Sequence, residues 1–190
     1  MQQQGGIKTK AVQARGVESW VKTVLILELV EAGNSVLELF CGSAVDLGKL
    51  QRANISFYSA VEPVSSLLQE AQKNYEKRNC PFKAQFYNFN PCTMPTISLP
   101  SNYNNNGTSA EAFASSSPAH DVVMCFGGLE AYCTSEQELF NVLQTAHSKL
   151  KPGGYFFGSM VDSSAVWSRA QKVLLNEHSS SGGNNNMDDQ

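Results

Sequence analysis

Two acidic residues and a glycine turn occupy positions where a parallel α/β sheet would bind a small ligand. Residues 36–50 read VLELFCGSAVDLGKL, an apolar run that stops at Cys41-Gly42 and continues into an amphipathic segment. Glu62 follows the next apolar run, about 20 residues beyond the turn, the spacing at which a carboxylate accepts hydrogen bonds from ribose hydroxyls. A solvated glutamate at a strand end is the alternative. Glu38 lies inside the first apolar run, where a charge needs a ligand ammonium group or a neighbouring lysine.

The turn restricts which ligand could use such a site. A dinucleotide-binding turn needs three glycines because the backbone must approach a pyrophosphate closely, whereas this turn reads Gly42-Ser43-Ala44-Val45-Asp46. The Gly-Lys-Ser/Thr signature of a phosphate-binding loop is also absent from the sequence. S-adenosylmethionine carries no phosphate and needs only an open turn for its amino-acid end and an acidic residue for its ribose. The pattern therefore favours S-adenosylmethionine as the cofactor.

Alternating helices and strands must position these residues. Apolar spacing predicts strands at 35–40, 55–63, 82–89, 120–126 and 155–160, and helices at 17–32, 44–52, 64–79, 134–150 and 163–177. This alternation predicts an α/β fold with a mostly parallel sheet, right-handed crossovers and helices on both faces. Ligands of such sheets bind at the carboxyl ends of the strands, which is where the first strand meets the glycine turn.

Composition narrows the class of protein and its organisation. We expect one domain at 16–178, between a disordered arm at 1–15 and a disordered tail at 179–190. Residues 90–119 are rich in Asn, Ser, Pro and Thr and are interpreted as a low-complexity insertion. The net charge of -3 argues against electrostatic nucleic-acid binding by the whole chain, and no apolar run approaches the roughly 20 residues of a membrane span. Five cysteines without a C-x-x-C pair predict reduced thiols, and three histidines without ligand spacing predict no metal site.

Three segments carry a resemblance to a known family. They are WVKTVLI at 20–26, the strand-turn-helix stretch at 36–50, and LKPGGYFFGSMVDSSAVW at 150–167. Together with the order of the strands between them, they resemble the mRNA cap guanine-N7 methyltransferases. The resemblance implies a Rossmann-like class I methyltransferase sheet, here lacking its last two strands. It also implies methyl transfer from S-adenosylmethionine to N7 of the cap guanine of RNA, in the nucleus.

The resemblance assigns contacts to both ends of the cofactor. Lys22 would bind the methionine carboxylate, with a helical ion pair to Glu18 as the alternative. Glu62 replaces an aspartate that binds the ribose and keeps the carboxylate.

Other cofactor contacts fall on residues that differ from the family pattern. Phe40, in place of a glycine, and Gly42 would contact the cofactor through their backbone. Asn90 stands where an aspartate accepts a hydrogen bond from the adenine amino group, and its amide oxygen is a weaker acceptor. Phe126 replaces a glutamine and would offer backbone contact and ring stacking, with a plain core role as the alternative.

The residues expected to contact the methyl acceptor, the RNA cap, differ more from the family pattern. Lys49 matches a lysine near the cap phosphates, and a solvated helix lysine is the alternative. The family's other cap-side positions are occupied here by Glu18, Ser19, Ser43 and Glu130. Glu130 stands at the histidine of a histidine-tyrosine pair, and Tyr132 lies one position beyond the family's tyrosine.

The implied methyl transfer requires few catalytic groups from the protein. N7 of guanine has a free lone pair and a sulfonium is a good leaving group, so we expect no catalytic acid, base or nucleophile, only alignment of the substrates. Three functions stay open: a diverged cap methyltransferase, a non-catalytic relative that binds the cofactor or only protein partners, and a small-molecule methyltransferase. We also expect a protein partner that covers the exposed edge of the shortened sheet.

Overall fold

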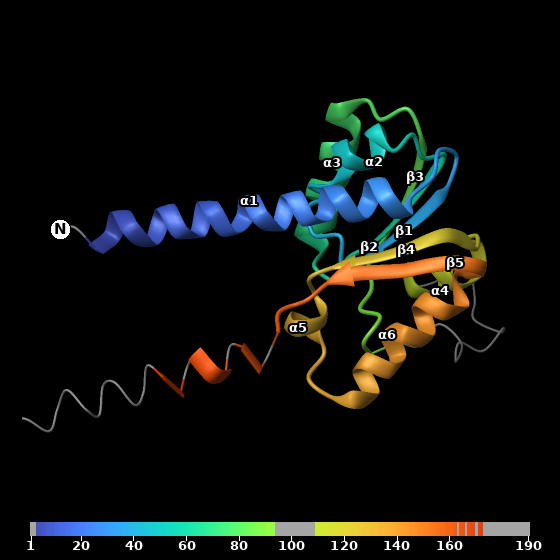
Figure 1. Cartoon of the computed structure of the whole chain (residues 1–190). Helices are drawn as coiled ribbons and strands as arrows, with labels where there is room; N and C mark the ends of the chain where they lie inside the picture. Colours follow the sequence, from blue (N-terminus) through green and yellow to red (C-terminus); the bar gives the residue numbers. More distant parts are fainter. Residues whose placement is uncertain (1–2, 94–108, 163, 166, 170, 173–190) are drawn as a thin grey trace, which may run out of the picture. The chain divides into compact units, whose positions relative to one another are not determined.

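A five-stranded sheet, parallel at every pairing, runs through the first of two structural units. The computed structural model describes residues 3–93, 109–162, 164–165, 167–169 and 171–172, and divides after Ser159. The strands follow the order β3-β2-β1-β4-β5 (Figure 1). They are β1 (Ser35–Leu39), β2 (Phe57–Val61), β3 (Lys83–Tyr87), β4 (His120–Phe126) and β5 (Leu150–Ser159). The parallel α/β sheet predicted from the sequence is confirmed, with the reversal of strand order between β1 and β4.

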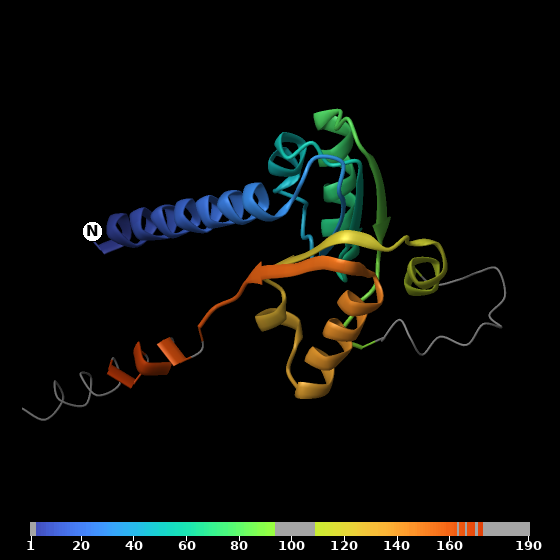
Figure 2. The same cartoon turned by 45° about the vertical axis from the view of Figure 1, so that its right-hand side comes forward.

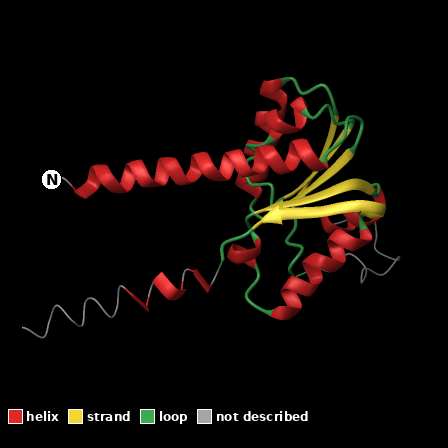
Figure 3. Ribbon diagram, in the orientation of Figure 1, coloured by secondary structure: helices red, strands yellow, loops and turns green. Residues whose placement is uncertain are grey.

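Helices cover both faces of this sheet (Figures 2 and 3). One face carries α1 (Gln3–Leu29), α2 (Leu47–Arg52) and α3 (Ser65–Arg78), and the other carries α4 (Ser109–Ser116), α5 (Leu129–Tyr132) and α6 (Glu136–Ser148). Successive strand side chains point to opposite faces, so Val36 packs under α1 and α2 while Leu37 packs toward α6. Two apolar layers therefore clamp the sheet, as a parallel sheet requires.

Among the expected elements that the structure describes in full, three have a boundary that differs from the expectation by more than two residues. The first helix begins at Gln3, so the arm expected at 1–15 is helical wherever it is described. The second helix begins at Leu47, after a turn through residues 41–46. The last strand, expected at 155–160, begins at Leu150, so that the Pro-Gly-Gly segment at 152–154 lies inside β5, where the register against β4 shifts. Bulges of this kind admit extra residues into a strand without ending it.

The expected low-complexity insertion contains a structural helix. Residues 94–108 lie outside the described part, but 109–116 form α4, and Phe113 on this helix is fully buried. The Lys149 ammonium lies 4.9 Å from the centre of the Phe113 ring and donates hydrogen bonds to the carbonyls of Ala114 and Ser117. The described end of the segment therefore belongs to the core of the sheet's second face.

The second unit begins at Met160 and is described only in part. Residues 164–165, 167–169 and 171–172 are helical, within the helix expected at 163–177. The Asp162 carboxylate accepts hydrogen bonds from the backbone N–H groups of Ser164 and Ala165, as a helix-capping residue does. The tail expected at 179–190 lies outside the described residues. No described helix is long and apolar enough to cross a bilayer.

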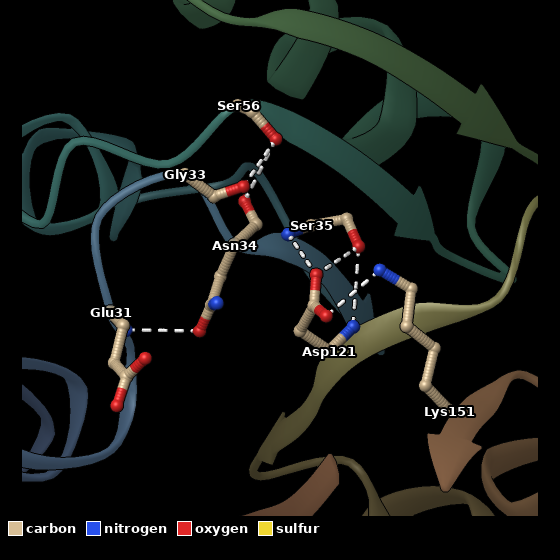
Figure 4. A network of polar contacts seen from close by, with 7 residues as sticks. All are labelled: Glu31, Gly33, Asn34, Ser35, Ser56, Asp121 and Lys151. Atoms are coloured by element: carbon tan, nitrogen blue, oxygen red, sulfur yellow. Dashed lines mark hydrogen bonds and ion pairs between the residues drawn. The ribbon is translucent and has the colours of Figure 1, made fainter.

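A polar network ties together the starts of three strands (Figure 4). Asp121 Oδ2 accepts hydrogen bonds from the backbone N–H and the hydroxyl of Ser35 at 2.8 and 2.7 Å, and Lys151 Nζ donates to Asp121 Oδ1 at 2.8 Å. Burial acts to raise the pKa of Asp121, but the hydrogen bonds from Lys151 and Ser35 outweigh it and lower this pKa to about 2. The network therefore fixes β1, β4 and β5 at the amino-terminal edge of the sheet.

One acidic side chain lies inside the core of the first face. Glu38 on β1 accepts a hydrogen bond from the Tyr58 hydroxyl, and both side chains are buried. Burial raises the pKa of Glu38 to about 8, although the Tyr58 hydrogen bond favours the charged form. Glu38 is therefore largely protonated at neutral pH, and a neutral carboxyl group is cheaper to bury than a carboxylate.

Phe113→Ala tests whether α4 belongs to the core. Removing a fully buried ring is expected to lower the free energy of unfolding by about 3–5 kcal/mol, measured by chemical denaturation. Phe140→Ala is the matched control because Phe140 is 53% exposed, and it is expected to cost roughly 1 kcal/mol or less. Equal costs at the two positions would contradict the placement of α4.

Glu38→Gln tests the buried carboxyl group. The pKa of Glu38 is higher in the folded chain than its ordinary value of 4.5. The stability that this group contributes is therefore complete below that value and is lost as the pH rises toward about 8. Glutamine does not titrate, so the variant is expected to gain stability over the wild type between pH 4 and pH 9. The gain should exceed about 1.4 kcal/mol, the equivalent of one pKa unit. Exposed Glu70 provides the control, Glu70→Gln, for which no such pH-dependent gain is expected.

Candidate functional site

Glu62 joins the ends of two neighbouring strands at the carboxyl edge of the sheet. Its Oε2 accepts a hydrogen bond from the backbone N–H of Gly42, in the turn after β1, at 2.9 Å. Its Oε1 accepts from the backbone N–H of Val64 at 2.9 Å. The side chain is only 1% exposed. The solvated-glutamate alternative is therefore wrong, and Glu62 is a fixed, buried acceptor beside the glycine turn.

One of two stacked aromatic rings contacts this carboxylate. The rings of Phe40 and Tyr132 stack with their centres 5.1 Å apart and their planes at 11°. The Tyr132 hydroxyl lies 3.4 Å from Glu62 Oε1. Tyr132 ends α5, which follows Gly127 and Gly128, both at positive φ. A ligand that reaches Glu62 from this side must displace Tyr132.

Phe40 itself has an unfavourable backbone conformation. Its φ is 57°, in the left-handed region, where a residue with a side chain costs roughly 1–2 kcal/mol. A Cβ on Gly128 would come within 2.5 Å of the Phe40 side chain, so the glycine makes room for the ring. The phenylalanine that replaces the family's glycine is thus accommodated by a glycine on the facing segment.

A cluster of alternating charges lies beside the turn. The Lys22 ammonium on α1 is 3.0 Å from Glu18 Oε1 and 3.4 Å from Asp46 Oδ2. Lys49 on α2 forms an ion pair and hydrogen bond with Asp46 Oδ1. Burial acts to lower the pKa of Lys22, but Asp46 and Glu18 outweigh it and raise this pKa. Asp46 therefore holds two ammonium groups from two helices at the edge of the site.

Asp46 is the residue that sequence reasoning missed. It immediately precedes α2, and its side chain is 2% exposed. The available signal was its spacing of three residues from Lys49, which places the two side chains on one side of the helix start. The structure contains the Lys22–Glu18 ion pair that was the alternative for Lys22, but adds a second carboxylate. The solvated-lysine alternative for Lys49 is wrong, because its side chain is 12% exposed and bound to Asp46.

The other expected cofactor residues lie near the same edge but are committed to protein contacts. Glu38 accepts a hydrogen bond from the Tyr58 hydroxyl, whereas the sequence offered a ligand ammonium group or a neighbouring lysine as its partner. Asn90 Oδ1 accepts a hydrogen bond from the backbone N–H of Cys92 at 3.0 Å. Phe126 is a core residue in edge contact with Phe157, as its alternative interpretation stated, and its ring also faces Lys22 Nζ at 5.3 Å.

The expected cap-side residues are only partly brought together. Glu18 and Lys49 belong to the cluster around Asp46. Among the described residues, no hydrogen bond or ion pair connects Ser19, Ser43 or Glu130 to that cluster. Ser19 and Glu130 are exposed, on α1 and α5. The Ser43 carbonyl accepts a hydrogen bond from the Asn74 side chain at 2.9 Å, which fixes the turn to α3.

The arrangement offers binding groups rather than groups for proton transfer. A buried carboxylate next to a glycine turn suits vicinal sugar hydroxyls, and a buried ammonium suits a carboxylate. These acceptor and donor types fit S-adenosylmethionine, provided that the Tyr132 hydroxyl leaves Glu62 Oε1. In the described part of the chain, no three His, Cys, Asp or Glu side chains are grouped as metal ligands.

Comparisons with known proteins identify the family of this chain. Residues 2–186 match the mRNA (guanine-N(7))-methyltransferase domain. The chain is 28% identical over 159 residues to mRNA cap guanine-N(7) methyltransferase 2 of Oryza sativa, covering 84% of this chain and 43% of that protein. It is 26% identical over 174 residues to mRNA cap guanine-N(7) methyltransferase of Saccharomyces cerevisiae, covering 91% of this chain and 38% of that one. The chain thus spans less than half the length of these relatives.

Solved structures share the fold. The PH0226 protein from Pyrococcus horikoshii superposes with a TM-score of 0.57 at 16% identity, covering 87% of this chain and 62% of that one. An S-adenosylmethionine-dependent methyltransferase from Clostridium acetobutylicum gives 0.52 at 18% identity, covering 81% and 55%. The sheet is therefore that of the class I methyltransferases, as the resemblance implied. Nearly the whole chain, residues 2–186, matches the family pattern. The chain therefore belongs to the mRNA (guanine-N(7))-methyltransferase domain family, whose cofactor is S-adenosylmethionine.

Proposed function

We propose that this chain binds S-adenosylmethionine at the carboxyl edge of the sheet and takes part in methylating N7 of the cap guanine of RNA. The observation that carries the proposal is the buried Glu62 carboxylate, hydrogen-bonded to the Gly42 N–H, with the Lys22 ammonium on the neighbouring helix. Two groups of opposite charge are thus held near one glycine turn. S-adenosylmethionine would supply the activated methyl group.

Each residue then has a binding role rather than a chemical one. Glu62 would accept hydrogen bonds from the ribose hydroxyls while keeping the Gly42 turn in place. Lys22 would exchange its contact with exposed Glu18 for the methionine carboxylate, while Asp46 keeps the ammonium positioned. Asn90 retains one free lone pair for the adenine amino group, because an amide oxygen has two lone pairs. No acid or base is required of any of them, since guanine N7 needs no deprotonation.

The acceptor would be a capped RNA 5′ end, as the names of the relatives indicate for those proteins. Lys49 is the candidate for the cap phosphates. In this role its ammonium group would contact a phosphate as well as Asp46. Ser19, Ser43 and Glu130 complete the proposed cap side. Such a role places the protein in the nucleus, where capping enzymes act.

A second function is favoured by one specific observation. Ser19, Ser43 and Glu130 differ from the family's cap-side residues, and among the described residues no hydrogen bond or ion pair joins them to the cluster that holds Lys22 and Lys49. A chain that binds the cofactor without transferring its methyl group would retain Glu62 and Lys22 and lose only the acceptor side. Cofactor binding without methyl transfer to a capped RNA oligonucleotide selects this second function.

We also propose that a partner polypeptide covers the free edge of β5. This strand is last in the sheet order, so its outer backbone groups have no strand partner within the sheet. Tyr155 and Phe156 on β5 are 57% and 39% exposed. A free edge with exposed aromatic side chains is a template for an added strand.

Glu62→Gln and Lys22→Ala test the cofactor site. Each variant is expected to weaken S-adenosylhomocysteine binding by about 1–3 kcal/mol, the range for a hydrogen bond to a charged group, as measured by isothermal titration calorimetry. Glutamine keeps the size of Glu62 but removes its charge and one of the two oxygens that accept hydrogen bonds from Gly42 and Val64. The free energy of unfolding of this variant is therefore measured beside its binding. Methyl transfer to capped RNA is measured in parallel.

Two exposed positions on α3 provide matched controls, Glu70→Gln and Lys73→Ala. These variants are expected to bind S-adenosylhomocysteine as the wild type does. Unchanged affinity in both site variants would contradict the site, and absence of binding by the wild type would contradict the proposed function.

The free edge predicts the behaviour of the chain in solution. We expect self-association or a low melting temperature for the chain alone, measured by light scattering after size-exclusion chromatography and by thermal denaturation. Tyr155→Lys puts a charge on the edge strand and is expected to reduce self-association. A wild-type monomer that melts at high temperature would contradict the partner proposal.

A further inference from the structure

Two thiols meet beside the candidate site. The sulfur atoms of Cys92 and Cys133 are 3.3 Å apart, although the residues are 41 positions apart in the sequence. Cys92 follows β3 and is fully buried, whereas Cys133 follows α5 and is half-buried. All five cysteines are free, and within the described chain this is the only pair whose sulfur atoms are in contact.

The two segments that carry these thiols differ in how firmly they are held. The Cys92 carbonyl accepts a hydrogen bond from the Asn141 side chain on α6 at 2.6 Å, and its N–H donates to Asn90 Oδ1. Cys133 directly follows the four-residue helix α5, and Gly127-Gly128 directly precede this helix. Two successive glycines can change φ and ψ freely, so they are suited to act as a hinge. A bond between the sulfur atoms would fasten the hinged segment to the fixed one.

We propose that Cys92 and Cys133 form an oxidation-sensitive pair whose disulfide holds Tyr132 over Glu62 and closes the site. Tyr132 directly precedes Cys133, and its hydroxyl is already 3.4 Å from Glu62 Oε1. The disulfide therefore stabilises the arrangement that the reduced chain shows, with the Phe40 ring stacked on Tyr132. The effect on cofactor affinity rests on the proposed function, whereas the formation of the disulfide does not.

The chemistry needs an oxidant, and a peroxide is sufficient. The Cys133 thiolate attacks hydrogen peroxide, the O–O bond breaks, and a sulfenic acid and one water form after proton uptake. The Cys92 sulfur then attacks the Cys133 sulfur, the S–O bond breaks, and the hydroxide leaves as a second water with the Cys92 proton. Two electrons pass from the two thiols to the peroxide. A thiol reductant reverses the change by thiol-disulfide exchange.

The order of the two steps follows from burial. Cys133 is half-buried and within reach of a small oxidant, whereas Cys92 is enclosed. Burial, and then the contact with Cys133, raise the pKa of Cys92 to about 12, which leaves very little thiolate for a first attack on peroxide. Cys133 is therefore the residue that reacts with the oxidant, and Cys92 resolves the sulfenic acid.

The first experiment identifies the bond in the chain of 190 residues. Peroxide treatment is expected to remove the mass of two hydrogen atoms, and a reducing agent to restore it. Cleavage after glutamate separates residues 77–111, which hold Cys80 and Cys92, from 131–136, which hold Cys133. These two peptides should be cross-linked in the wild type and in Cys80→Ser, but not in Cys133→Ser. Absence of the cross-link in folded wild type would overturn the pair.

The second experiment tests closure with two readouts. Oxidation is expected to slow hydrogen exchange of residues 129–133, whether or not a cofactor binds, because the segment opens less often. It is also expected to weaken S-adenosylhomocysteine binding by about tenfold or more, because apparent affinity falls with the fraction of open molecules. Cys133→Ser should show neither response to peroxide, and its affinity should equal that of reduced wild type. Unchanged exchange in the cross-linked protein would overturn closure.

The two proposals fail in different ways. If the reduced wild type does not bind S-adenosylhomocysteine, the proposed function fails, while the cross-link and the exchange rates still decide the switch. If the reduced and oxidised forms bind equally well, the cofactor site stands and the closure by Tyr132 is overturned.

Discussion

The site depends on one carboxylate that bridges two strand ends. Parallel pairing brings the carboxyl ends of β1 and β2 to the same edge, and Glu62 joins them through the N–H groups of Gly42 and Val64. Hydrogen bonds to a charged acceptor are stronger than those between neutral groups. The same side chain therefore shapes the glycine turn and presents the acceptor beside it, so structure and binding cannot be separated at this residue.

In the closed state of the site, Tyr132 contacts Glu62 and stacks on Phe40. Two opposing contributions to the free energy determine its stability. Phe40 has a backbone conformation that glycine prefers, but its ring is buried and stacks on Tyr132. The stacking and burial of two rings offset the backbone cost, since aromatic pairs contribute about 0.5–1.5 kcal/mol beyond their burial. Opening the site means separating these rings and moving α5, a single helical turn between two glycines and Cys133. A reducible bond at that position would change the balance without altering the binding residues.

Local patterns predicted the sheet well, because β1, β2 and β4 are short, mainly apolar runs ended by turn residues. They failed at α4, where Phe113 lies in a polar stretch and its ring packs on Tyr87, Phe89 and Lys149, all distant in the sequence. They also missed Asp46, whose importance comes from Lys22 on another helix. The Tyr132 contact with Glu62 could not be predicted either, since it spans 70 positions and depends on how α5 packs. In each case the contact joins segments that are far apart in the sequence, and a local pattern does not show that folding brings them together.

The charge cluster beside the turn is electrically balanced, and this limits what it can attract. Lys22 and Lys49 face Glu18 and Asp46, so two cations are matched by two anions within a few ångströms. Such a group exerts little force beyond its own contacts, and the whole chain carries a net charge of -3. Counterion release, which draws basic proteins to nucleic acids, requires unpaired cations facing the phosphates. A polyanion would therefore gain little from these two lysines until it displaced a carboxylate, and its long-range attraction to the protein must originate elsewhere.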